Sequence, residues 1–168
     1  RFIKPLLDIF TEIDSKKHIL FMGYGRLEEM IKEYASKYKN IHFHPAVPIN
    51  EILKYAQSAD VGISLNENIC LNHFYTIPNR FFECILAGIP VIASDFPDMG
   101  KYVDDYEFGW KVFPEYEKVK KLIDGITREQ VIEKRKKAIA ACSQFGWHIE
   151  EKVLFDVYKD ILEGKKLK

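Results

Sequence analysis

The sequence has little cysteine, no excess of either charge and no long apolar run. Its cysteines, Cys70, Cys84 and Cys142, are odd in number and widely spaced, a usage typical of a reducing compartment. No apolar run approaches the ~20 residues needed to cross a bilayer, and no N-terminal targeting segment is visible. We therefore expect a cytoplasmic protein. Basic clusters at 118–121 and 134–137 leave peripheral association with the inner face of a membrane open.

The absence of net charge also limits the partners. The 25 basic and 25 acidic side chains balance, so the strong positive field that non-specific nucleic-acid binding requires is missing. Cys70 and His73 have a ligand-like spacing, and His42 and His44 alternate onto one strand face, but no second cysteine pair completes a zinc set. We expect no nucleic acid, no metal and no bound cofactor.

What the chain does contain is an alternation of short apolar runs with amphipathic segments, over a length of 168 residues that suits one domain. Strands are expected at 18–23, 41–44, 60–65, 90–94 and 109–113. A helix candidate follows each of these strands, and the clearest are at 26–38, 50–59, 78–86 and 116–126. Near-continuous apolar strands separated by helices indicate a parallel sheet covered on both faces. The expected fold class is therefore α/β, a Rossmann-like three-layer sandwich with a mostly parallel sheet.

The two ends of the chain break this alternation. The chain opens with what reads as a helix over 1–13, and from Thr127 onward two helices follow one another without a strand, meeting near 145–147. Apolar residues recur at helical spacing in the last of them. We expect 146–163 to be a C-terminal packing helix that closes the core.

Ligands of an open parallel sheet bind outside the carboxyl ends of its strands. Gly23 and Gly25 follow the first apolar run and allow a close approach of the backbone to a ligand. As a dinucleotide fingerprint the turn fails, because Glu28 stands where the third glycine is required. A plain tight turn is an equally good interpretation.

A helix start is expected at Pro78, whose missing N–H costs nothing in the first turn, with the Thr76 hydroxyl available for capping. The N–H groups of Asn79 and Arg80, the helix dipole and the guanidinium could together hold a diphosphate without a metal. The alternative is a surface ion pair between Arg80 and Glu83, worth only ~0.2–0.5 kcal/mol.

Glu83 lies one turn inside this helix. A carboxylate there can accept two hydrogen bonds from vicinal hydroxyls such as those of a ribose, and its apolar neighbours argue against an idle surface position. Gly88 is expected to end the helix in the left-handed conformation, and Pro90 prevents its continuation.

The order and spacing of these segments resemble the C-terminal domain of GT-B glycosyltransferases, especially glycosyl transferases group 1, often called family four. The resemblance covers nearly the whole chain. The segments that carry it are GYG at 23–25, the run at 41–65, PNRFFECILAGIPVIASD at 78–95, Gly109, and the closing FGWHIEEKVLFDVYKDIL. It implies that 1–168 is a single nucleotide-sugar-binding domain, the C-terminal half of a GT-B fold, without the N-terminal domain that supplies the acceptor site.

The same resemblance implies a donor site. In it Glu83 binds the nucleotide ribose, and Asn79 and Arg80 face the diphosphate. The implied site residues are Gly23, Gly25, Ala46, Val47, Pro78, Asn79, Arg80 and Glu83, with Arg1 and Lys4 as candidate cations. The glycines would line the nucleotide cleft, and the two residues after the second strand would lie near the base.

Three features depart from the family pattern. Tyr75 stands where the family often has an earlier glutamate, and Glu67 in the same loop is the alternative carboxylate. Pro45 and Pro78 replace glycines, the second as in a subgroup with a P-x-K/R-x-x-E pattern. The family domain begins with a strand, whereas this chain begins with a helix. The resulting gap in the sheet is filled by direct pairing of its neighbours, by another chain, or not at all.

The implied function is transfer of a hexosyl group from a UDP- or GDP-sugar to a glycan or lipid-linked acceptor in surface polysaccharide or glycolipid biosynthesis. The family needs no bound metal, and retention of anomeric configuration is expected. This chain alone is expected to bind nucleotide weakly and to transfer nothing. The alternatives are a nucleotide-sugar epimerase of the same fold and a non-catalytic interaction domain.

Overall fold

The structure, a computed structural model, describes residues 2–13 and 16–164. The strands in this part of the chain are β1 (Ile19–Met22), β2 (Ile41–His44), β3 (Gly62–Ser64), β4 (Val91–Ser94) and β5 (Gly109–Val112). The helices are α1 (Ile3–Glu12), α2 (Glu28–Lys37), α3 (Ile52–Gln57), α4 (Leu71–Tyr75), α5 (Asn79–Leu86), α6 (Pro97–Tyr106), α7 (Tyr116–Gly125), α8 (Arg128–Cys142) and α9 (Trp147–Leu162). Each expected strand and helix is present, which confirms the α/β class.

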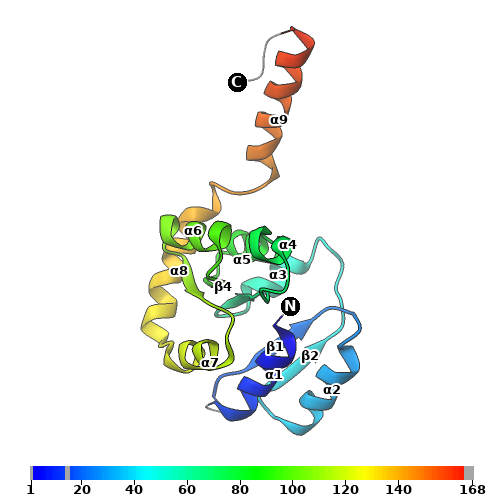
Figure 1. Cartoon of the computed structure of the whole chain (residues 1–168), viewed down its shortest axis with the longest axis vertical. Helices are drawn as coiled ribbons and strands as arrows, with labels where there is room; N and C mark the ends of the chain where they lie inside the picture. Colours follow the sequence, from blue (N-terminus) through cyan, green and yellow to red (C-terminus); the bar gives the residue numbers. More distant parts are fainter. Residues whose placement is uncertain (1, 14–15, 165–168) are drawn as a thin grey trace.

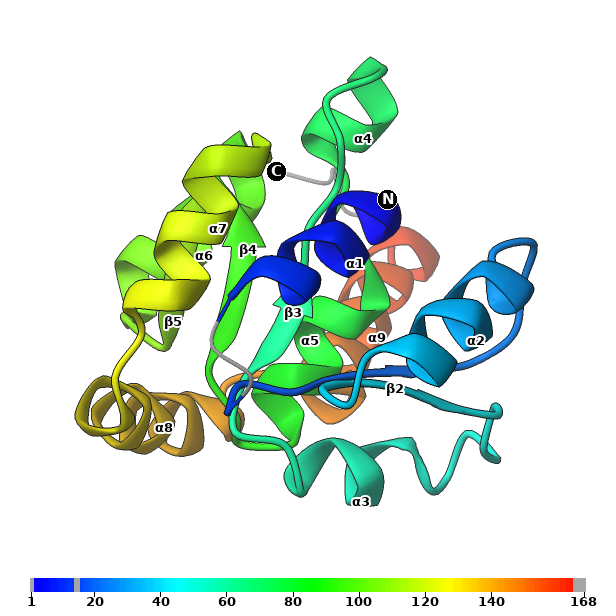
Figure 2. The ribbon, with the colours of Figure 1, turned by 90° about the horizontal axis from the view of Figure 1, so that it is seen from below.

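The strands form two parallel sheets. β1 pairs with β2, and β4 lies between β3 and β5. In Figure 2, β3 and β4 run side by side while β2 lies apart from them. Among the described residues, β1 and β3 are not hydrogen-bonded to each other. The expected gap in the sheet is therefore not filled by direct pairing of β1 with β3.

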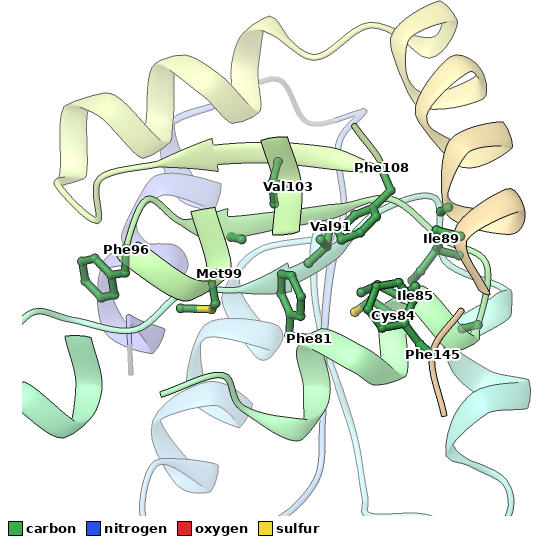
Figure 3. Packing of buried hydrophobic residues seen from close by; sticks show 14 residues of the cluster. Phe81, Cys84, Ile85, Ile89, Val91, Phe96, Met99, Val103, Phe108 and Phe145 are labelled. Carbon is green, nitrogen blue, oxygen red and sulfur yellow. The ribbon is translucent and has the colours of Figure 1, made fainter. Parts of the chain in front are cut away.

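One core lies between the three-stranded sheet and the helices α5, α6 and α8. All four residues of β4 are buried, and Phe81 and Ile85 of α5 are fully buried against them. Figure 3 shows these two side chains with Met99, Phe108 and Phe145 around the sheet. Because they are four positions apart, these two residues lie on one apolar face of α5, which packs against the sheet.

A second core joins the two sheets. Leu7 and Ile9 of α1 are fully buried in a cluster that contains Ile41 of β2, Ile92 of β4 and Val119 of α7. The helix at the start of the chain thus covers residues of both sheets. The sheets are separate in hydrogen bonding but share apolar packing.

One helix was not expected, and another was expected after the strand at 90–94 but without bounds. α4 lies in the stretch 66–77, which has no clear apolar period, and is only five residues long. α6 begins with Pro97 in its first turn, followed by Asp98, which is a recognised helix-start signal. The helices among the described residues include none that is long and apolar enough to cross a membrane.

The last helix differs from expectation. α9 forms where it was predicted, but none of its residues is buried, and Figure 1 shows it projecting away from the body of the molecule. Gly146, with φ of 118°, turns the chain at its start. The prediction that this helix closes the core is corrected for a physical reason: helical spacing identifies an apolar face but does not provide the surface that covers it.

Candidate functional site

One group of predicted site residues lies at the carboxyl end of the β1–β2 sheet. Gly23 and Gly25 have φ of 144° and 153°, which few residues other than glycine adopt. The Gly23 N–H donates to the carbonyl oxygen of His44 at 3.1 Å, so the glycine turn is held against the end of β2. Ala46, exposed, and Val47, half-buried, follow β2 after Pro45. These four residues therefore share one edge.

The second group lies at the start of α5. Pro78 is the N-cap residue, with φ of −75° and ψ of 150°, and the helix begins at Asn79, which is exposed. No side chain caps the helix, so the predicted capping by the Thr76 hydroxyl is not made. The first N–H groups of a helix have no intrahelical acceptor and carry the positive end of its dipole.

Arg80 is anchored to the end of β3. Its Nη2 donates to the carbonyl oxygen of Leu65 at 3.0 Å and to Oδ1 of Asn66 at 2.7 Å. The side chain is half-buried. These contacts hold the guanidinium at the carboxyl edge of the sheet, in the first turn of α5.

Asn66 and Ser94 were missed as site residues. Both are buried, at 4% and 0% exposed. The Ser94 hydroxyl accepts a hydrogen bond from the Asn66 N–H at 2.8 Å and donates to the Asn66 carbonyl oxygen at 3.0 Å. The only signal in the sequence is that each polar residue falls at or just after the carboxyl end of an apolar strand.

Glu83 lies one turn further along α5 and is half-buried. Its neighbour Cys84 points into the core, and burial raises the pKa of that thiol to about 12, which keeps it protonated and unsuited to act as a nucleophile. The start of α5 therefore presents backbone N–H groups, one guanidinium and one carboxylate. Such a set can bind an anion and a diol.

The two candidate cations at the chain start are placed differently. Arg1 lies outside the described residues. The Lys4 ammonium donates to both carboxylate oxygens of Asp8, at 3.0 and 2.8 Å, and to the Tyr34 hydroxyl at 3.4 Å. The hydrogen bond to Asp8 raises the pKa of Lys4. The described contacts of Lys4 thus lie on α1 and α2.

The loop between β3 and α5 contains the remaining candidates. Tyr75 is 56% exposed, and a ring nitrogen of His73 lies 3.2 Å from the carbonyl oxygen of Glu67. Within the described ranges, no group of three or more His, Cys, Asp or Glu residues could hold a metal ion. Cys70 and His73 therefore have no third such residue beside them in that part of the chain.

The fold and sequence were compared with known proteins. The structure is similar to the crystal structure of WaaG, a glycosyltransferase involved in lipopolysaccharide biosynthesis, with a TM-score of 0.61 and 13% sequence identity. The match covers 90% of this chain and 42% of that chain, so this chain spans less than half of the other's length. At this identity the likeness establishes the GT-B type of fold. Comparison with curated protein sequences gave no match.

The sequence comparison adds what the fold alone does not provide. The family model described as "Glycosyl transferases group 1" matches residues 3–128. This range begins in α1, ends in the first turn of α8 and contains both groups of predicted site residues. On this evidence the chain belongs to the group 1 glycosyl transferases.

Proposed function

We propose that this chain is the donor-binding domain of a glycosyltransferase that uses a UDP- or GDP-sugar. The observation that carries the proposal is the start of α5. There, Arg80 stands in an uncapped first turn and Glu83 one turn on. N–H groups and a guanidinium suit a diphosphate, because fixed donors stabilise negative charge on it without a metal. The Glu83 carboxylate suits the hydroxyls of a ribose.

The other residues of the proposed site follow from the same edge of the fold. The glycine turn at Gly23 and Gly25 allows the backbone to approach the nucleotide, and Ala46 and Val47 would lie near its base. Transfer itself needs an acceptor site. Since the chain spans 42% of the WaaG chain, we propose that a further domain provides that site for a glycan or lipid-linked acceptor.

Calorimetric titration with UDP, GDP, their sugar conjugates and the matching nucleosides tests the proposal. We expect weak binding of the nucleotides. The Glu83→Ala variant should lose affinity for nucleosides and nucleotides alike, because the ribose is common to both. Arg80→Ala should lose affinity for the diphosphates and keep it for the nucleosides.

Two outcomes would contradict the proposal. If the folded protein binds none of these ligands, the domain is not a nucleotide site. If Arg80→Ala weakens nucleoside and diphosphate binding equally, the assigned phosphate role is wrong. Circular dichroism of each variant checks that the fold is intact.

A further inference from the structure

Asn66 connects three elements beneath the proposed donor site. It follows β3 and is 4% exposed. Its side-chain oxygen accepts from Arg80 of α5 at 2.7 Å, while its backbone N–H and carbonyl oxygen both bond the hydroxyl of Ser94, the last residue of β4. The main chain of Asn66 is therefore fixed by one strand while its side chain fixes the direction of the guanidinium.

The chemistry of this contact is specific. A guanidinium only donates hydrogen bonds, so the amide of Asn66 must present its oxygen to Arg80. Two acceptors of Nη2, this amide oxygen and the Leu65 carbonyl, are both neutral. They fix the orientation of the group, and neither of these two contacts pairs it with a negative charge. An aspartate at the same position would have nearly the same shape but would form an ion pair with Arg80.

We propose that Asn66 is a positioning residue for the proposed donor site: it directs the Arg80 guanidinium towards the diphosphate of the nucleotide through an acceptor that carries no charge of its own. The inference rests on the function proposed above and adds to it a residue that touches no ligand. It also assigns a reason for an amide, rather than a carboxylate, at the end of β3.

The deciding variant is Asn66→Asp, compared with Asn68→Asp. Asn68 is an exposed residue of the same loop, so its substitution adds the same charge nearby. We expect Asn66→Asp to lower the affinity for UDP or GDP about tenfold or more, the range of a charge-assisted hydrogen bond, while uridine or guanosine binding is unchanged. Asn68→Asp should change the ratio of the two affinities little.

Asn66→Ala provides a second test, because it removes the acceptor without adding charge. We expect a smaller loss that is again confined to the diphosphate. Thermal melting of each variant reports folding separately from binding. If the aspartate variant does not fold, the alanine variant alone tests the positioning role of Asn66.

The outcomes separate the two proposals. If the unsubstituted chain binds no nucleotide, the proposed function fails, and this inference with it. If the unsubstituted chain binds diphosphates through Arg80, but Asn66→Asp and Asn66→Ala behave as Asn68→Asp does, the donor site stands and the positioning role of Asn66 is overturned. A purely structural role predicts lower stability with an unchanged ratio of affinities.

Discussion

The two sheets are built from similar apolar strands but are covered to different extents. β4 has a strand on each side, and all four of its residues are buried. In β1 only the first residue is buried, and Leu20 is 55% exposed. The two sheets therefore show that the burial of a strand depends on what packs against its faces as well as on its composition. In a parallel sheet, helices normally cover both faces.

The proposed site draws on both halves. Arg80 and Glu83 stand on the helix packed against the fully buried strand β4. Gly23 and Gly25 follow β1, which pairs with one strand, β2, in the part of the chain that the structure describes. We therefore expect the diphosphate and ribose contacts to be rigidly held, and the glycine turn to tolerate more change. The following variants test how far the two halves differ in stability.

The largest effect is expected from truncating the core of the three-stranded half. Phe81→Ala removes a fully buried ring and should lower the free energy of unfolding by about 3–5 kcal/mol. Phe43→Ala in β2 removes a half-buried ring. It should lower the free energy of unfolding clearly less, because folding removes less of the apolar surface of this ring from water. Urea denaturation measures both, and equal losses would abolish the distinction between the halves.

A smaller effect is expected where β4 meets β5. Gly109 pairs with Val91, and a Cβ at this position would collide with the Val91 carbonyl oxygen. Gly109→Ala should therefore destabilise the chain by about 1–3 kcal/mol. Gly125→Ala is the matched control, because a Cβ at the end of α7 meets open space. Thermal unfolding compares the two variants. Similar melting temperatures would show that β4 and β5 can move apart enough to accommodate the added methyl group.

The smallest effect concerns the junction of α1 and α7, which covers both sheets. The Tyr116 hydroxyl donates to Glu12 at 2.9 Å, and burial, with this hydrogen bond, raises the pKa of Tyr116 to about 12. A raised pKa means that the stabilisation is complete below pH ~10, the ordinary value of tyrosine, and is lost as the pH rises towards 12. Tyr116→Phe should cost about 0.5–1.5 kcal/mol at pH 8.

The pH dependence provides the check on this last prediction. The difference in free energy of unfolding between the unsubstituted chain and Tyr116→Phe should shrink between pH 10 and pH 12, as measured by urea denaturation at each pH. A difference that stays constant over this range would show that the hydroxyl does not contribute through its protonated form.

The sequence was sufficient for elements whose signal is local. The five strands were predictable because each is a short apolar run between polar segments, and the start of α5 was predictable from Pro78 and the residues that follow it. α4 was missed because five residues are too few to display a helical period. A helix was expected after the strand at 90–94 but was given no bounds, although Pro97 and Asp98 mark the start of α6.

Contacts between distant residues were not predictable. The link from Arg80 to Asn66 spans 14 positions, and that from Asn66 to Ser94 spans 28. The first depends on α5 packing beside β3, and the second on β3 and β4 being neighbours. No local pattern in the sequence states either arrangement. The same limit explains α9: its apolar face could be predicted, but not whether another surface would cover it.

The chain contains two tryptophans, and their placement makes them optical reporters of different events. Trp110, in β5, is half-buried, with the Lys134 ammonium 5.5 Å from its ring centroid. Trp147, the first residue of α9, is 65% exposed. Emission from Trp110 should therefore follow melting of the sheet, while acrylamide quenching of Trp147 should respond to anything that covers the projecting helix.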